Sequence, residues 1–436
     1  MRYIIIGNSA AGIGAVEGIR QIDKQGEITV ISNERHHTYS RPLISYFLHG
    51  KVTVEQMKYR SDNFYTDNNV SLLSGVTVTK IDADNKLAVL SNGNNMPYDK
   101  LLVAAGSSPF VPPFEGLDTV IDKFTFMSMD DAQKLDEALE RKKDARVLII
   151  GAGLIGLKCA EGIAKKVSKK NAPRSGINPS ARITVADLAP GILSSILDKE
   201  GAALVQRHLE AQGIEFKLAN SVKKIENNRA LFDNGDAVGF DALVLAVGVR
   251  PNTSLLQGIA GIERGIMVNG KSETSAPDIY AAGDCTQTLD ISSGHSKIMA
   301  LLPNAYMQGE CAGINMAAGA AGEAVEKNFD KAIPMNAIGF FGLHMITAGN
   351  YTGETYQKIE GDNYKKLFHS DNRLNGYILI GNVEKAGIYT SLIRERTPLD
   401  SIDFALVCEK PGLMAFTKEE RMAKLGGLNE MNREGQ

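Results

Sequence analysis

Short apolar runs alternate with helical patterns along the first half of the chain. Two stretches show an apolar run, a helical pattern and a second run, at residues 2–6, 13–22 and 28–31 and again at 146–150, 157–165 and 183–186. Continuous short apolar runs are typical of strands buried on both faces of a parallel sheet. The pattern therefore predicts two α/β domains, each beginning as strand, helix, strand.

The pattern changes after about residue 326. Alternating apolar and polar positions at 364–369 and 374–382 predict two strands of an antiparallel sheet. A helical pattern follows near 388–396, and residues 417–425 predict a charged helix at the tail. We expect a small α+β domain in this part of the chain.

A glycine turn joins the first strand to its helix, with the sequence Gly-Asn-Ser-Ala-Ala-Gly at residues 7–12. Gly7 permits a sharp exit from the strand, and Gly12 lets the helix pack closely on the sheet. Ser9 replaces the usual middle glycine and is small enough to let a pyrophosphate approach. The backbone N–H groups of the turn and the positive helix end attract that anion. We expect Gly7, Ser9, Ala10, Ala11 and Gly12 to form a dinucleotide site.

The second turn, Gly-Ala-Gly-Leu-Ile-Gly at residues 151–156, contains all three glycines. It lies between a strand and a helix, which is the context that makes such a motif meaningful. We expect Gly151, Gly153, Leu154, Ile155 and Gly156 to bind a second dinucleotide.

An acidic residue follows each turn near the end of the next strand. Such a carboxylate binds the ribose hydroxyls of a dinucleotide. Glu34 is the candidate for the first turn, although Ser32 and Asn33 occupy the strand end itself. Asp187 is the candidate for the second, and a carboxylate there favours NADH because it repels the 2′-phosphate of NADPH. NADPH is kept as the less favoured alternative.

Composition and charge exclude several functions. The net charge of -3 gives no general attraction for nucleic acid or an anionic membrane. No apolar stretch approaches the roughly 20 residues that a spanning helix needs. The chain starts within a strand pattern rather than a charged leader, so we expect a cytoplasmic protein. The 4 cysteines and 7 histidines show no metal-binding spacing, and we expect no metal.

Three further segments resemble the pyridine-nucleotide-dependent flavoprotein reductases of the glutathione-reductase structural class. Residues 98–109 resemble the strand and A-T-G turn of that family, with Ala105 in place of threonine before Gly106. Residues 241–252 resemble the matching turn after the NAD domain, with Gly248. Residues 275–284 resemble the late FAD signature, in which Gly283 precedes an aspartate, Asp284, that binds a ribityl hydroxyl.

This resemblance implies both the fold and the cofactors. The fold class is α/β, with two Rossmann-like three-layer domains, one for FAD and one for NAD(H), and a small α+β C-terminal interface domain. It implies an FAD-binding domain at residues 1–116 and 245–325, an NAD-binding domain at 117–244 and an interface domain with a helical tail at 326–436.

Residues 39–45 narrow the resemblance, because Tyr-Ser-Arg-Pro-Leu-Ile-Ser is similar to a segment of rubredoxin reductases, oxygenase-type ferredoxin reductases and the FAD portion of assimilatory nitrite reductases. Arg41 and Pro42 carry the match and are expected at the FAD site. These enzymes have no redox disulfide, and no cysteine precedes Cys159 in this chain. A disulfide substrate and cysteine-sulfenate chemistry are therefore disfavoured.

Lys158 and Tyr46 are the candidate catalytic residues. The ferredoxin reductases place a lysine and a glutamate at the matching positions, beside the flavin N5 and the nicotinamide. Here Tyr46 stands in place of the lysine, and Lys158 in place of the glutamate. We hypothesise that Lys158 stabilises negative charge on the reduced flavin and orients the carboxamide of the nicotinamide. The alternative is a lysine that points to solvent from its helix.

A basic segment follows the second helix. Between Glu161 and Asp187 there is no acid, whereas the segment 165–182 contains Lys165, Lys166, Lys169, Lys170, Arg174 and Arg182. One hypothesis is that it steers an acidic rubredoxin or ferredoxin towards the flavin. The alternatives are a weaker discrimination against NADPH and a solvated insertion.

The resemblance implies an FAD-dependent oxidoreductase that moves electrons between NADH and a small iron–sulfur carrier, rubredoxin or ferredoxin-like, by hydride transfer at flavin N5. The alternatives are an NADH oxidase or diaphorase using oxygen or quinones, and a flavoprotein subunit of a larger redox complex. A homodimer is an expectation from the family only. The sequence leaves open which carrier is used and in which direction electrons flow.

Overall fold

The computed structural model describes residues 1–142, 144–167, 182–318, 325–419 and 421–422. The chain forms two compact units. The first unit contains residues 1–289 and 296–330, and the second contains residues 290–295 and 331–436.

The first unit contains two five-stranded sheets, and each is parallel throughout. In spatial order, the strands of the first sheet are β19 (Ile279–Ala281), β7 (Lys100–Val103), β1 (Arg2–Ile6), β2 (Glu27–Ser32) and β3 (Val70–Ser74). Those of the second sheet are β12 (Ile214–Lys217), β11 (Ile183–Ala186), β10 (Val147–Ile150), β16 (Ala242–Leu245) and β9 (Lys123–Phe124). The strands predicted around both glycine turns are confirmed.

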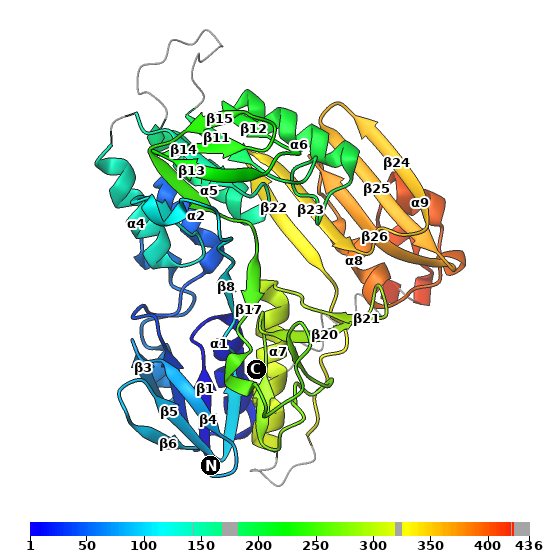
Figure 1. Cartoon of the computed structure of the whole chain (residues 1–436). Coiled ribbons are helices and arrows are strands. Elements are labelled where there is room, and N and C mark those ends of the chain that lie inside the picture. Colours follow the sequence, from blue (N-terminus) through cyan, green and yellow to red (C-terminus); the bar gives the residue numbers. More distant parts are fainter. Residues whose placement is uncertain (143, 168–181, 319–324, 420, 423–436) are drawn as a thin grey trace. The chain divides into compact units, whose positions relative to one another are not determined.

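Helices connect and cover these strands (Figure 1). Those of the first unit are α1 (Ala10–Ile22), α2 (Ile44–His49), α3 (Phe64–Asp67), α4 (Met129–Glu140), α5 (Leu154–Val167), α6 (Lys199–Ala211) and α7 (Leu302–Ala318). Smaller strands are β4 (Val78–Asp82), β5 (Leu87–Leu90), β6 (Asn95–Pro97), β8 (Ser107–Pro109), β13 (Val222–Glu226), β14 (Arg229–Phe232), β15 (Ala237–Gly239), β17 (Val249–Pro251), β18 (Ile266–Met267), β20 (Thr286–Asp290) and β21 (His295–Lys297). In Figure 1 the paired strands β8 and β17 run between the two parallel sheets.

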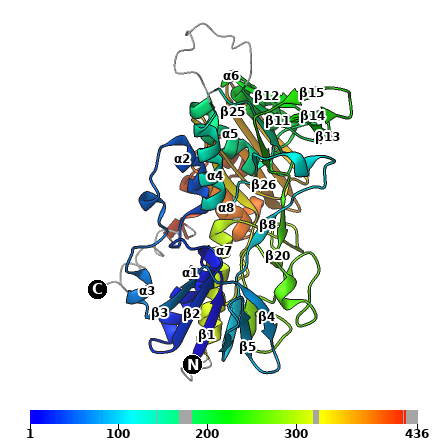
Figure 2. The same cartoon turned by 60° about the vertical axis from the view of Figure 1, so that its left-hand side comes forward.

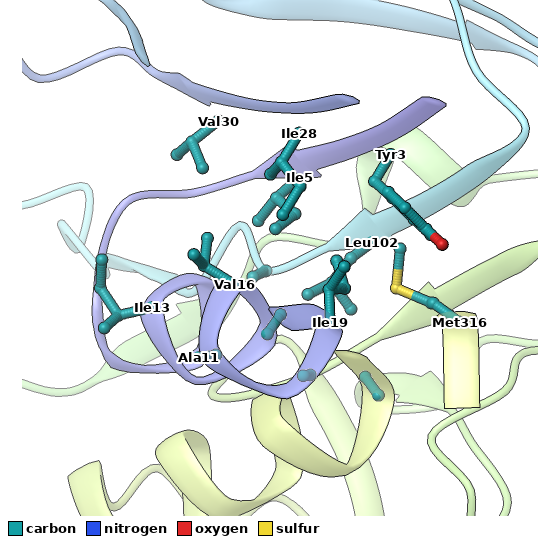
Figure 3. Close-up of a cluster of buried hydrophobic side chains, with 14 of the residues drawn as sticks. Tyr3, Ile5, Ala11, Ile13, Val16, Ile19, Ile28, Val30, Leu102 and Met316 are labelled. Carbon is teal, nitrogen blue, oxygen red and sulfur yellow. The ribbon is translucent and has the colours of Figure 1, made fainter. Parts of the chain in front are cut away.

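The first sheet lies between a helical layer and a β layer. Alternate residues of β1 face opposite sides of the sheet and therefore pack against different layers. Tyr3 and Ile5 belong to a buried cluster with residues of α1 and α7. Ile4 and Ile6 belong to a second cluster with residues of β4 and β5. Figure 3 shows the helical side, where Ile5 lies among side chains of β2 and α1. The α/β fold with two Rossmann-like three-layer domains is thereby confirmed.

Helices α1 and α7 approach so closely that only glycine fits at four positions. An added Cβ at Gly14 or Gly18 of α1 would overlap a backbone carbonyl oxygen of α7. An added Cβ at Gly309 or Gly313 of α7 would overlap a carbonyl oxygen of α1. Each pair is four residues apart, so the glycines form a stripe along one face of each helix.

The helical core gives a first testable prediction. Ile19 on α1 is 0% exposed, so Ile19→Val should lower the free energy of unfolding by about 1 kcal/mol. Urea unfolding followed by circular dichroism measures the change. Ile121 is 93% exposed, and Ile121→Val is the matched control, expected to unfold like the wild type. Equal losses in both variants would contradict this description of the core.

The second unit is an antiparallel sheet covered by short helices. In spatial order its strands are β22 (Met335–Phe340), β23 (Leu343–Gly349), β26 (Arg373–Ile380), β25 (Asn363–Ser370) and β24 (Glu354–Glu360). The helices are α8 (Ala386–Arg394) and α9 (Phe404–Glu409). The two strands predicted here are confirmed as β25 and β26, which pair antiparallel. The predicted helix is α8, and the predicted tail helix falls partly outside the described residues.

Candidate functional site

The first glycine turn has the backbone that the sequence predicts. Gly7 adopts a φ of 122°, in the left-handed region that favours glycine. An added Cβ there would overlap the carbonyl oxygen of Ala104, and one at Gly12 would overlap the carbonyl oxygen of Gly7. The turn therefore brings the first turn of α1 directly against the end of β1.

The N-terminus of α1 is suited to an anion. Ser9 is the N-cap residue, and its side chain makes no capping hydrogen bond. The first turn of α1, which includes Ala10 and Ala11, contains no acidic residue. Free backbone N–H groups and the positive end of the helix dipole favour a phosphate at this position.

Glu34 and Arg41, both predicted at the first site, bind each other directly. The guanidinium of Arg41 pairs with Glu34 Oε1, and the hydroxyl of Tyr39 donates to Glu34 Oε2 at 2.7 Å. Arg41 also donates from Nη1 to the carbonyl oxygen of Met127 at 3.0 Å. Pro42 follows within the short 3-10 helix Arg41–Leu43. No pattern in the sequence indicates that Tyr39 is a partner of Glu34.

Asp284 lies close enough to Arg41 for the two charges to interact. Burial raises the pKa of the Asp284 carboxyl, and the positive charge of Arg41 opposes that rise. Gly283 beside it has a φ of 80°. A partly buried acid next to an arginine suits a hydrogen bond to a ligand hydroxyl, which is the role expected for Asp284.

Gln308 is a residue of this site that sequence analysis missed. Its Oε1 accepts hydrogen bonds from the Gly283 N–H at 2.8 Å and from the Thr286 hydroxyl at 3.0 Å. Gln308 is 3% exposed, and its Nε2 has no hydrogen-bond partner. A buried donor without a partner costs roughly 1–3 kcal/mol. The only sequence signal was a polar residue on the buried face of a helix.

The first unit has two halves, one built on each parallel sheet, and the other two predicted turns lie where the chain passes between these halves. Gly106 has a φ of 66° and Gly248 a φ of 120°. Asn252 joins the two turns, since its N–H donates to Gly106 O at 3.0 Å and its Nδ2 donates to Ala105 O at 2.8 Å. These turns are therefore fixed relative to each other.

The second glycine turn repeats the geometry of the first. Gly151 has a φ of 116°, and an added Cβ at Gly156 would overlap the carbonyl oxygen of Gly151. Gly153 has no heavy atom within 4 Å of an added Cβ, so open space lies beside it. Leu154 and Ile155 begin α5, whose first turn contains no acidic residue. The space and the helix end together suit a pyrophosphate.

Asp187 holds the second turn in place. Its Oδ2 accepts from the Ala152 N–H at 2.6 Å, and its Oδ1 accepts from the Ala189 N–H at 2.8 Å. A carboxylate has about four acceptor positions, so both oxygens still have room for a ribose hydroxyl. The aspartate at the end of β11 therefore fixes the turn, and its role at a ribose hydroxyl stays a prediction.

Lys158 does not point to solvent. Its side chain is 15% exposed, and its ammonium pairs with Glu161 one turn along α5. The ammonium also lies 4.8 Å from the centroid of the Tyr46 ring. The structure thus brings Lys158 and Tyr46 together, across the packed helices α2 and α5. Glu161 was missed, although its spacing of three residues from Lys158 was a readable signal.

Most of the basic segment at 165–182 lies outside the described residues. Of its members that are described, Lys166 pairs with Asp136 and Arg182 pairs with Asp144. The steering hypothesis for this segment stays a prediction.

Two further features concern metal ligands and membrane spans. Among the described residues, no group of three metal-ligating side chains comes together. Within that same part of the chain, no helix is long and apolar enough to cross a membrane.

Each of the two parallel sheets has a glycine turn, a helix that begins at that turn, and an acid within two residues of the end of the next strand. This arrangement defines a protein that binds two dinucleotides. The chain belongs to the pyridine nucleotide-disulphide oxidoreductase family, whose model matches residues 1–309. Residues 334–397 match a second family, the rubredoxin NAD+ reductase C-terminal domain. The chain is therefore an oxidoreductase.

Relatives match almost the whole chain. NADH-dependent phenylglyoxylate dehydrogenase subunit epsilon of Aromatoleum evansii is 31% identical over 411 residues, covering 91% of this chain and 92% of that protein. NADH-rubredoxin oxidoreductase of Clostridium acetobutylicum is 27% identical over 387 residues, covering 88% and 91%. The solved covalent putidaredoxin reductase–putidaredoxin complex shares the fold, with a TM-score of 0.83 at 21% identity and coverage of 97% and 98%.

FAD and NAD(H) are the cofactors of this chain, and its residues fit both groups. The first turn offers a glycine cradle that a Cβ would fill, and the buried Nε2 of Gln308 lies at the Gly283 turn without a partner. The second turn offers the open space beside Gly153. We assign FAD to the first turn and NAD(H) to the second as part of the proposal below.

Proposed function

We propose that this chain moves electrons between NADH and a small iron–sulfur carrier, of the rubredoxin or ferredoxin kind, by way of bound FAD. When bound, FAD supplies a store for two electrons that accepts hydride at N5 and releases electrons singly, which nicotinamide does not do readily. The match of residues 334–397 to the rubredoxin NAD+ reductase C-terminal domain supports this kind of acceptor.

The observation that carries the proposal has two parts. One compact unit contains both dinucleotide turns, and the cysteines of the chain are buried rather than reactive. Cys159, Cys285, Cys311 and Cys408 are all buried and unpaired. Burial raises the pKa of the Cys159 thiol and raises that of Cys285 to about 12. The thiolate, which is the reactive form, is therefore scarce near neutral pH. Electrons have no disulfide to receive them within the chain and must pass to an external acceptor.

The proposal gives each predicted residue a task. Glu34 and Asp284 bind hydroxyls of FAD, and Arg41 offsets the charge around them. Asp187 binds the ribose of NADH. Lys158, held between Glu161 and the Tyr46 ring, presents a fixed positive charge where negative charge develops. A cytoplasmic location belongs to the same proposal, and four unpaired cysteines are in keeping with it.

Anaerobic stopped-flow spectroscopy tests the function. The purified holoprotein is mixed with NADH or with NADPH while the flavin absorbance is followed. Fast bleaching by NADH, slower bleaching by NADPH and rapid recovery on adding oxidised rubredoxin or ferredoxin are expected. Recovery that is faster with oxygen or a quinone than with either carrier would instead indicate an oxidase or diaphorase. No bleaching by either nucleotide would overturn the proposal.

A second candidate function is a flavoprotein subunit of a larger redox complex. One observation favours it, namely the match over 92% of a relative that is itself named as a subunit of an NADH-dependent dehydrogenase. Tagged chain purified from its native cells should then retain stoichiometric partners. A chain that purifies alone and turns over rapidly with a free carrier would argue against this candidate.

Lys158 gives a kinetic prediction. Lys158→Met should slow flavin bleaching at saturating NADH by about 10- to 100-fold, because a preorganised charge is lost. Lys51→Met is the matched control, since its ammonium lies 5.4 Å from the centroid of the same Tyr46 ring and its side chain is exposed. The control should bleach at the wild-type rate. Equal rates for both variants would remove Lys158 from the proposed mechanism.

A further inference from the structure

Tyr39 occupies a junction between the proposed FAD site and the start of α4. Its hydroxyl donates to Glu34 Oε2 at 2.7 Å and accepts a hydrogen bond from the N–H of Met129 at 3.0 Å. A hydroxyl has one proton, so donation to Glu34 leaves the lone pairs of Tyr39 available for Met129. The first residue of α4 is thus bonded, through one oxygen atom, to a carboxylate expected to bind FAD.

Two neighbouring contacts connect the same segments. Arg41 pairs with the other oxygen of Glu34 and donates to Met127 O at 3.0 Å. His36 Nε2 lies 2.5 Å from Asp130 Oδ1. The guanidinium of Arg41 also lies 5.3 Å from the centroid of the Tyr39 ring. Residues 36–41 therefore contact residues 127–130 at three points.

The start of α4 is otherwise a well-formed cap. Ser128 is the N-cap residue, and it forms a reciprocal capping box with Asp131. A capping box satisfies two backbone N–H groups, and Met129 lies between those two residues. The capping box does not bind the N–H of Met129. The hydroxyl of Tyr39 accepts the hydrogen bond from that N–H instead.

We propose that Tyr39 is a positioning residue that couples FAD binding at Glu34 to the ordering of the first turn of α4. This inference rests on the proposed function, because it takes Glu34 to be an FAD ligand. A ribose hydroxyl bound to Glu34 restricts that carboxylate, the carboxylate restricts Tyr39, and Tyr39 restricts Met129. Thermodynamic linkage makes this coupling reciprocal. The factor by which bound FAD favours an ordered first turn of α4 is also the factor by which that ordered turn strengthens FAD binding.

The coupling reaches the NADH side of the unit through packed helices. Helix α2 contacts both α4 and α5, and the three lie together in Figures 1 and 2. Tyr46 on α2 and Lys158 on α5 meet across that packing. An ordered start of α4 therefore supports the helices that hold the proposed catalytic pair.

Hydrogen exchange measured by mass spectrometry tests the inference. Peptides covering residues 127–135 are followed in flavin-free protein and in protein reloaded with FAD. In the wild type, FAD should slow exchange of the Met129 amide at least about 10-fold. Tyr39→Phe should abolish that FAD-dependent slowing and weaken FAD binding, measured by fluorescence titration, by about 10-fold.

Two variants keep the test decisive. Tyr98 is 1% exposed, and its hydroxyl has no hydrogen-bond partner, so Tyr98→Phe should behave like the wild type in both measurements. Glu34→Ala removes the acceptor of the Tyr39 hydroxyl and leaves Tyr39 itself in place. At saturating FAD this variant should lose the slowing at 127–135, and it decides the matter if Tyr39→Phe does not fold.

The outcomes separate this inference from the proposed function. Wild-type protein that fails to bind FAD would overturn the proposed function itself. Wild-type protein that binds FAD without slowed exchange at 127–135 would overturn only the coupling. Slowing that persists in Tyr39→Phe would likewise show that α4 is ordered by another route.

Discussion

Gly156→Ala is expected to lower kcat/KM for NADH about 100-fold while leaving the FAD content of the purified protein unchanged. An added Cβ would overlap the carbonyl oxygen of Gly151 and lie 3.3 Å from Ile149 Cγ2. The first obstacle is backbone, which cannot rotate away, so the start of α5 must move from the turn. A displacement of about 1 Å in a positioning group costs on the order of 100-fold in rate.

A matched glycine provides the control for this experiment. Gly387 lies in α8, and no heavy atom lies within 4 Å of an added Cβ there. Gly387→Ala should leave the kinetics unchanged and stabilise the protein by about 0.4–1 kcal/mol. Circular dichroism confirms that both variants are folded. Wild-type kcat/KM in Gly156→Ala would contradict the assignment of NADH to this turn.

Asp187→Asn is expected to reduce the preference for NADH over NADPH by about 100-fold. The substitution removes the negative charge that repels a 2′-phosphate and weakens the hydrogen bonds to ribose hydroxyls, which are worth about 1.5–3 kcal/mol when one partner is charged. The asparagine also accepts fewer hydrogen bonds than the carboxylate, which holds the amides of Ala152 and Ala189. We therefore expect kcat/KM for NADH to fall by about 10-fold or more.

The ratio of kcat/KM for the two nucleotides is the quantity to measure. Asp233 is an exposed acid in the same half of the unit, and Asp233→Asn should leave the ratio at the wild-type value. If both variants shift the ratio equally, general electrostatics accounts for the preference. A ratio unchanged in Asp187→Asn would place the ribose of NADH elsewhere.

The sequence predicted those parts of the site that depend on local backbone. In each half, the glycine turn, the helix after it and the acid near the next strand end lie within about 40 residues of one another. Asp187 is the acid that follows the second turn. Their geometry follows from steric rules for glycine and from the order of strand and helix. The structure shows the expected left-handed backbone at Gly7 and Gly151.

The contacts that join distant segments were not predictable in the same way. Tyr39 bonds Met129 across 90 positions, and Gln308 bonds Gly283 across 25. No periodicity connects such pairs, because their distance depends on the packing of the whole unit. Glu161 is different, since its pairing with Lys158 follows from helical spacing alone and was overlooked.

The two glycine stripes have a consequence for how the chain is made. The stripe on α1 is translated almost 300 residues before its counterpart on α7, and the sheet built from β9 to β16 is complete in between. Domains generally fold as units while the ribosome extends the chain. We expect residues 117–244 to acquire their structure first. Residues 1–116 should complete their packing only after α7 has been synthesised. Ribosome-bound chains stalled near residue 280 should resist proteolysis within 117–244 but be cleaved within 1–116.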